Sequence, residues 1–179
     1  MTPDPNHIKT FMECLGIQRS RELPKSPLND FFRHVNATVE AVNGPGAVRV
    51  VVSFPDGHQL RLGRRHGTAA RKRWFKDMGD PFFNLETHSK IERGVEGWAV
   101  DPQDIDGYIF SWDPEISTRE YIFWTHEILE AMREFWPMLR KTDRDTTQWT
   151  PGSHHSRSLL VSVNEMHEML ETMSGQPTV

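Results

Sequence analysis

The run from Val48 to Phe54 constrains the fold of this chain more than any other feature. It is β-branched and almost wholly apolar, and its part from Val48 to Val52 predicts a central strand that is buried on both faces. Pro55-Asp56-Gly57-His58 predicts a turn, and Gln59 to Gly63 returns with Leu60 and Leu62 on one side. The sequence therefore predicts a β-hairpin inside a sheet.

Helical spacing of apolar residues recurs on both sides of this hairpin. It predicts helices from Asn6 to Leu15, from Pro27 to Val42, from Thr125 to the neighbourhood of Pro137, and from Asn164 to Met173. Asn6, Thr125 and Asn164 are the expected caps, and Asn43-Gly44-Pro45-Gly46 is expected to end the second helix.

Further strands are expected along the second half of the chain. They are Phe82 to Glu86, a second hairpin of Ile105 to Trp112 with Glu120 to Trp124, and Leu159 to Val163, whereas Asp143 to Ser158 is expected to be a polar loop. Strands and helices are mixed without βαβ alternation, so we predict an α+β fold with a central mixed sheet flanked by helices. We expect one domain over residues 1–179, with a helix and connector at 1–26 and the core at 27–175.

Composition narrows the class of protein. The 179 residues are 36% hydrophobic and 26% charged, and no apolar run is long enough to cross a bilayer. The N-terminal residues lack the basic leader of a secretory signal. Cys14 is the single cysteine, which excludes an intramolecular disulfide and favours a cytoplasmic location. The oligomeric state is left open.

The charges are divided unequally along the chain. Residues 1–76 hold 13 basic and 6 acidic residues, and the remainder holds 8 basic and 19 acidic ones. The segment from His58 to Lys76 has no acid and contains Arg61, Arg64, Arg65, Arg71, Lys72, Arg73 and Lys76. Such a segment can bind phosphates, and it can equally be attracted to the acidic half or simply be solvated.

The hairpin from Ala47 to Arg65 resembles the catalytic hairpin of PD-(D/E)XK nucleases. In that family an Asp near the start of the apolar strand and the acid of an acid-x-Lys motif on the return strand hold Mg²⁺, and the Lys activates water. Asn84-Leu85-Glu86, Gly97-Trp98 and the stretch from Asp106 to Trp112 extend the resemblance to a phage-associated branch over roughly residues 30–175. The resemblance implies a restriction-endonuclease-like fold and a mobile-element role.

The expected catalytic positions do not carry catalytic residues. The Asp position falls on Arg49, the second acid on Arg64 and the Lys on Arg65, with Gly63 beside them. Guanidinium groups repel Mg²⁺ and suit anions, so the resemblance implies a catalytically degenerate protein that binds nucleic acid or a protein complex. We expect no metal and no cofactor in it. The expected anion-binding residues are Arg49, Arg61, Arg64, Arg65, Arg71, Lys72 and Arg73.

Two alternatives stay open. A Mg²⁺-dependent endonuclease would need relocated groups, for which Glu40, Glu86 and Lys90 are the candidates. A protein-interaction module would instead use the acidic residues as a mimic of a nucleic-acid backbone. Those residues are Asp101, Asp104, Asp106, Asp113 and Glu115.

Short histidine motifs point to other chemistry. Arg65-His66-Gly67-Thr68 matches the signature of histidine phosphatases, and His66-Gly67-Thr68 with His154-His155-Ser156 imitates two-histidine phosphoesterases. Neither tract is expected to lie in a strand as those families require. The remaining histidines lack the spacing of metal ligands, so no zinc site is expected.

Overall fold

The computed structural model describes residues 4–14, 21–23, 36–44, 47–66, 81–102, 104–139, 145–150 and 154–175. The fold is α+β, and the chain divides into two compact units. Unit 1 comprises Met1–His66 and Asp104–Trp124, and unit 2 comprises Gly67–Gln103 and Thr125–Val179. Within the described ranges, no helix is long and apolar enough to cross a membrane.

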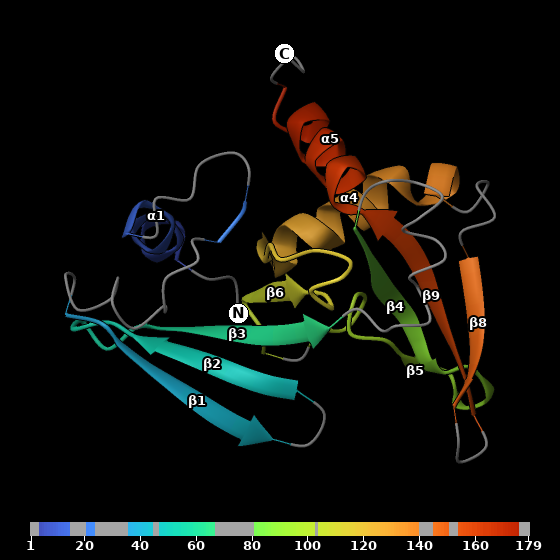
Figure 1. The fold of residues 1–179 in the computed structure, drawn as a ribbon, viewed down its shortest axis with the longest axis horizontal. Helices are drawn as coiled ribbons and strands as arrows, with labels where there is room; N and C mark the ends of the chain where they lie inside the picture. The colour runs from blue at the N-terminus through green and yellow to red at the C-terminus, as the bar shows by residue number, and fades with distance from the viewer. Residues whose placement is uncertain are drawn as a thin grey trace. The chain divides into compact units, whose positions relative to one another are not determined.

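Unit 1 contains a mixed five-stranded sheet (Figure 1). Its strands are β1 (Thr38–Gly44), β2 (Ala47–Ser53), β3 (Gln59–His66), β6 (Gly107–Ser111) and β7 (Tyr121–Trp124), in the order β1-β2-β3-β6-β7. Strands β3 and β6 are parallel, whereas the other neighbours are antiparallel. The mixed sheet and both predicted hairpins, β2–β3 and β6–β7, are confirmed.

The β2–β3 hairpin pairs Val52 with Leu60 and Val50 with Leu62. Its turn is closed by the backbone, because the amide of Phe54 donates to the carbonyl oxygen of His58 at 2.9 Å. Val52 is fully buried, but Val51 and Val50 are only partly buried. The prediction of a strand buried on both faces is therefore wrong for the described part of β2.

The helix predicted up to Val42 is wrong at its C-terminal end. Residues 38–44 form strand β1, which is antiparallel to β2 with Gly44 paired to Ala47. Asn43 and Gly44 belong to β1 and therefore do not end a helix, and residues 45 and 46 of the predicted stop lie outside the described residues. Residues 24–35, where that helix was expected to begin, lie outside the described residues.

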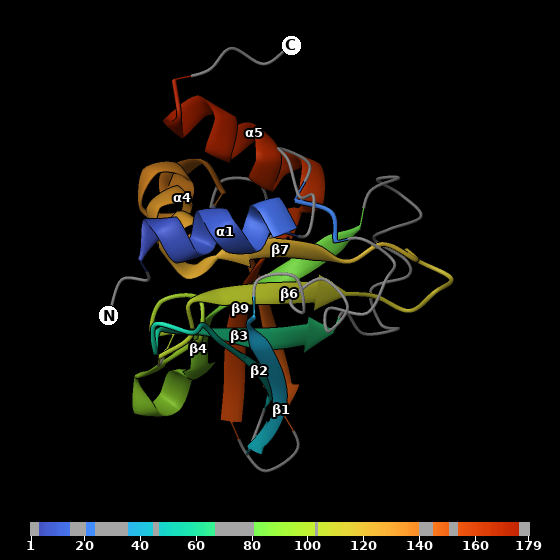
Figure 2. The same ribbon diagram turned by 90° about the vertical axis from the view of Figure 1, so that its left-hand side faces the viewer.

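Helix α1 (Pro5–Cys14) packs against one face of the five-stranded sheet (Figure 2). Asp4 precedes it and accepts a 2.8 Å hydrogen bond from the amide of Asn6, so the predicted cap Asn6 is wrong by two residues. Phe11 is fully buried and meets Trp124 edge-on with ring centroids 5.6 Å apart. The shared core also contains Leu23, Ala37, Val52, Phe54, Leu60, Leu62, Ile109 and Ile122, with Ile8 and Met12 at its border.

Unit 2 contains a four-stranded sheet and the last two helices. Its strands, in the order β5-β4-β9-β8, are β5 (Val95–Glu96), β4 (Phe82–Lys90), β9 (His154–Ser162) and β8 (Asp145–Thr150), all antiparallel to their neighbours. A 3-10 turn, η3 (Ile91–Arg93), joins β4 to β5. Helices α4 (Thr125–Leu139) and α5 (Val163–Met173) contact each other, as Figure 1 shows.

The polar loop predicted for residues 143–158 is wrong. The segment contains β8 and the first half of β9, which pair from Thr150 with His154 to Asp145 with Leu159. A polar, threonine-containing sequence is compatible with an edge strand, since only one side of such a strand has a hydrogen-bonded neighbour. Polarity was therefore a poor indicator of a loop here.

Helix α5 begins with a capping box at Ser162 rather than at the predicted Asn164. The Ser162 hydroxyl accepts from the amide of Glu165 at 3.1 Å, and the Glu165 carboxylate accepts from the amide of Ser162 at 2.9 Å. Ser162 also ends β9, so this reciprocal pair fixes the point at which strand becomes helix.

Replacing Ser162 with Ala should lower the free energy of unfolding by about 1 kcal/mol, because the amide of Glu165 loses its acceptor. Urea denaturation followed by circular dichroism measures this loss. Asn164→Ala is the comparison variant, and a larger loss there than at Ser162 would contradict the assignment of the cap.

Candidate functional site

The register of the hairpin separates the arginines of β3. Arg49 is paired directly with Gly63, and side chains alternate along a strand, so Gly63 and Arg65 share one face of β3 while Arg64 lies on the other. The three positions that the nuclease resemblance brings together therefore do not all lie on one face of the sheet.

Gly63 leaves no room for a larger residue. A Cβ atom there would lie 2.7 Å from both Cδ1 and Cε1 of Tyr108, whose side chain is only 2% exposed. The guanidinium carbon of Arg65 lies 5.4 Å from the centroid of the same ring, within the range of a cation–π contact. The aromatic ring of Tyr108 thus occupies the space beside Gly63 and Arg65.

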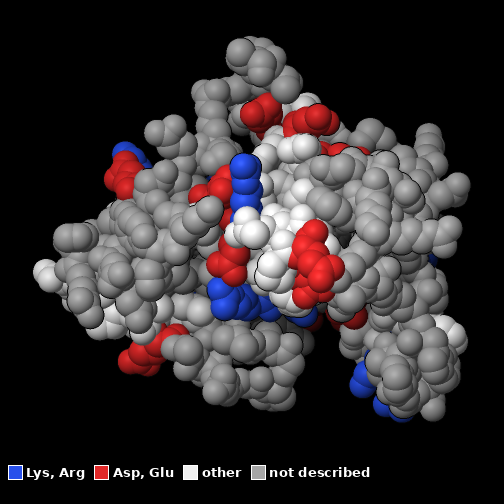
Figure 3. Space-filling view, in the orientation of Figure 1, with Lys and Arg blue, Asp and Glu red and all other residues white. Residues whose placement is uncertain are grey.

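The exposed arginines of β3 lie beside carboxylates. The Nη2 of Arg64 donates to Oε1 and Oε2 of Glu120 at 2.9 and 3.2 Å, and Arg61 lies 3.8 Å from Asp104. Figure 3 shows blue and red side chains of the described residues next to one another near the centre of the view. Such exposed pairs add little stability, but they reduce the positive potential of β3.

Asp106 links β3 to the start of β6. Its carboxylate accepts from the amide of Arg61 at 2.7 Å, while its own amide donates to the Arg61 carbonyl oxygen at 2.8 Å. Burial raises the pKa of Asp106, although the bond from Arg61 opposes that shift. Asp104 and Asp106 are therefore engaged inside unit 1, which weakens the interpretation of these two acids as a nucleic-acid mimic.

The three residues that the endonuclease alternative requires do not form one site within either unit. Glu40 is exposed on β1 in unit 1, whereas Glu86 and Lys90 are half-buried on β4 in unit 2. The backbone of Glu86 has a structural role, because its carbonyl oxygen accepts from the amide of Ala99 at 3.0 Å. A Cβ on Gly97 would lie 2.2 Å from that oxygen, so Gly97-Trp98 is a close turn over β4.

Three of the predicted anion-binding residues, Arg71, Lys72 and Arg73, lie outside the described residues. Of the others, Arg61 and Arg64 are exposed and Arg65 is half-buried, and Arg49 is described through its backbone pairing.

The histidine motifs do not form a phosphoesterase site within either unit. His66 ends β3 in unit 1, where Nδ1 lies 3.2 Å from the Ser111 hydroxyl and Nε2 lies 3.7 Å from Asp113. His155 lies on β9 in unit 2, so the expectation that it lies in a loop is wrong. Its amide and its Nδ1 both bind the carboxylate of Glu92.

The bonds from His155 lower the pKa of Glu92 to about 2 from its usual value near 4.5. A lowered carboxyl pKa contributes stability above the unfolded value that is lost as the pH falls toward the folded value. Glu92→Gln should therefore be less stable than the wild type above pH 4.5, and this difference should shrink between pH 4.5 and about 2. Thermal denaturation across that pH range tests this, and a pH-independent difference would contradict it.

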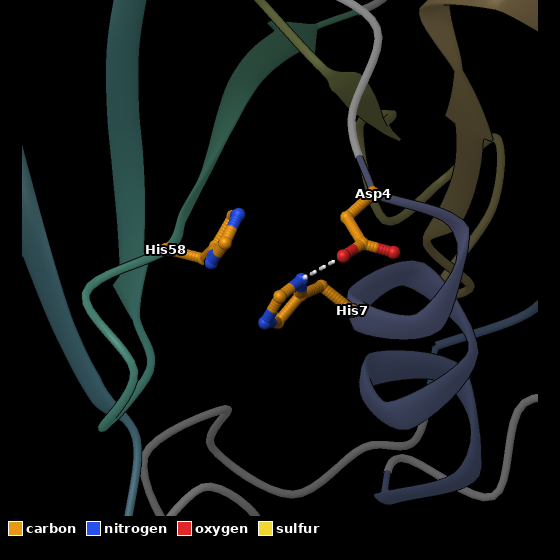
Figure 4. A group of neighbouring side chains, drawn as sticks. All are labelled: Asp4, His7 and His58. Carbon is orange, nitrogen blue, oxygen red and sulfur yellow. Dashed lines mark ion pairs between the residues drawn. The ribbon is translucent and has the colours of Figure 1, made fainter.

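Unit 1 also gathers histidines and aspartates from the start of α1 and from the β2–β3 turn (Figure 4). His7 Nδ1 lies 3.3 Å from Asp4 Oδ2, and His7 Nε2 lies 2.7 Å from Asp56 Oδ2. The His58 ring stacks on the His7 ring with centroids 4.3 Å apart, and its Nδ1 lies 3.4 Å from the same Asp56 oxygen. Within the described part of the chain, Asp4, His7 and His58 form the one group with ligand atoms close enough for a metal ion.

Sequence reasoning missed this group. Its members come from two segments about fifty residues apart, and spacing rules detect ligands only when they follow one another closely. Two weak signals were present, namely the one-turn spacing of Asp4 and His7 and the pair Asp56 and His58 in a predicted turn.

Comparisons with protein-family models, curated proteins and solved structures gave no match.

The contact between Gly63 and Tyr108 yields a stability prediction. Gly63→Ala should lower the free energy of unfolding by about 1–3 kcal/mol, because the buried ring of Tyr108 cannot move aside. Urea denaturation is the measurement. The same substitution on a Tyr108→Leu background should cost less, and equal costs on both backgrounds would contradict the contact.

Proposed function

We propose that this chain is a nuclease-like protein that binds nucleic acid without cleaving it. The proposal rests on the resemblance of the β2–β3 hairpin to the PD-(D/E)XK hairpin and on the restriction-endonuclease-like fold that this resemblance implies. The main observation in favour of a protein that does not cleave nucleic acid is the packing of Tyr108 against Gly63.

An acid-x-Lys motif needs two side chains on one face of the return strand, since residues two apart share a face. On β3 the two positions with this spacing are Gly63, which is paired with Arg49, and Arg65, whereas Arg64, on which the resemblance places the second acid, lies on the other face. Gly63 has no carboxylate and no space for one beside Tyr108, while Arg65 lies over the same ring. Mg²⁺ requires oxygen ligands, and Gly63 and Arg65 supply none. The packing of Tyr108 therefore supports a hairpin that no longer catalyses hydrolysis.

The binding surface in this proposal is the basic segment from Arg61 to Lys76. Arg64 contributes least, because its guanidinium is held by Glu120. The proposal therefore assigns most of the phosphate contacts to Arg71, Lys72 and Arg73, which follow β3 in the sequence without an intervening acid. The resemblance to phage-associated relatives makes a mobile-element role, including interference with a host or defence complex, the proposed context.

Binding should be measured by fluorescence anisotropy of labelled duplex DNA, single-stranded DNA and RNA over a series of salt concentrations. Affinity should fall steeply with salt, and replacing Arg71, Lys72 and Arg73 together with Glu should abolish binding at about 0.1 M salt. Arg119→Glu is the matched control, because Arg119 is an exposed arginine in unit 1 outside the basic segment and should leave binding nearly unchanged.

A plasmid assay with Mg²⁺ or Mn²⁺ tests the non-catalytic part, and no cleavage is expected. Cleavage that disappears in Glu86→Ala would replace the proposal with an endonuclease that uses relocated carboxylates. Absence of nucleic-acid binding at about 0.05 M salt would instead direct attention to a protein partner.

A further inference from the structure

We propose that Asp4, His7 and His58 form a binding site for a divalent first-row transition metal ion, with Asp56 orienting the two imidazole rings. The site lies where the start of α1 meets the β2–β3 turn, both within unit 1. One ligand atom from each of the three residues lies within 4.8 Å of the others.

The orientation of the His7 ring is the first argument. Its Nε2 lies 2.7 Å from Asp56 Oδ2, and a carboxylate only accepts hydrogen bonds, so Nε2 carries a proton. The Nδ1 of a neutral ring then presents a lone pair. Within the described residues this Nδ1 is buried and has no hydrogen-bond partner, although Asp4 Oδ2 lies 3.3 Å away (Figure 4). A lone pair facing a carboxylate oxygen is repulsive, and a cation between the two atoms converts that repulsion into coordination.

The position of His58 indicates that the cation between His7 and Asp4 is a metal ion and not a proton. A proton on His7 would join Asp4 to Asp56 and would make no use of a second imidazole. The His58 ring nevertheless stacks on His7 at an interplanar angle of 25°, and its Nδ1 lies 3.4 Å from Asp56 Oδ2. His58 thus offers a ring nitrogen as the third donor atom, beside the groups of Asp4 and His7. The side chain of His58 is 58% exposed, so the ring has freedom to turn toward an ion.

Asp56 has the position of the outer carboxylate that often orients metal-bound imidazoles. Its Oδ2 faces one ring nitrogen of each histidine, and its Oδ1 accepts from the amide of His58 at 3.0 Å. A carboxylate in this place fixes the tautomer of a histidine and raises its basicity as a ligand.

The donor set indicates the class of ion. Two imidazole nitrogens and one carboxylate oxygen suit Zn²⁺, Co²⁺ or Ni²⁺, whereas Mg²⁺ and Ca²⁺ prefer sites made of oxygen. Three protein ligands leave a fourth position for water or for a group of a partner molecule. Such an ion would join α1 to the hairpin turn, two segments about fifty residues apart in the chain.

Isothermal titration calorimetry of the full chain with Zn²⁺, together with the visible absorption of the Co²⁺ form, tests the site. We expect one ion per chain at this site and an affinity that falls at least about tenfold in His58→Ala. Asp56→Asn should weaken binding less, because it removes an orienting group and not a ligand. His126→Ala is the control, since His126 is an exposed histidine of α4 in unit 2 and should leave binding unchanged.

Two outcomes would overturn the proposal. Equal Zn²⁺ affinity in the wild type and in His58→Ala would place the ion elsewhere in the chain. If neither ion binds at concentrations up to about 1 mM, at which even a weak site would be occupied, then Asp4, His7 and His58 do not form a metal site. Circular dichroism checks the fold of His58→Ala, which should be unchanged because the His58 side chain is exposed.

Discussion

Backbone pairing between β2 and β3 is the constraint on which unit 1 depends. With Val52 opposite Leu60 and Arg49 opposite Gly63, the apolar side chains of β3 point to the core beneath α1. A shift by one residue would move every side chain of the strand to the opposite face. The same register also sends Arg64 to one face and Arg65 to the other, so it decides where the basic residues of the strand can act.

This arrangement places carboxylates beside arginines of β3, so the positive charge of the strand is compensated locally. The sequence divides into a basic and an acidic part, but β3 receives its carboxylates from nearby strands and turns of unit 1. Glu120 precedes β7 and holds Arg64, while Asp104 and Asp106 precede β6 and contact Arg61. Parallel pairing of β3 with β6 brings these acids to the arginines. A segment with no acid in its own sequence is thus partly neutralised in the folded chain.

Much of the local structure was predictable because its causes are local. The apolar run from Val48, the turn residues after Phe54 and the helical spacing in α1, α4 and α5 each depend on neighbours in the chain. The errors arose where tertiary context overrode a local signal. Residues 38–44 carry valines at a spacing that suits one face of a helix, yet they form a strand because β2 offers a partner. Asp145–Thr150 is polar but pairs with β9.

The sequence by itself determined the α+β class, the two hairpins of unit 1 and the absence of acids from the segment between His58 and Lys76. Only the tertiary structure decided that Tyr108 occupies the space beside Gly63 and that Arg61 and Arg64 lie beside carboxylates. It alone brought Asp4 and His7 to Asp56 and His58. The physical reason is that each of these contacts joins residues some fifty positions apart, and such a contact depends on strand register and helix docking, which no short stretch of sequence encodes.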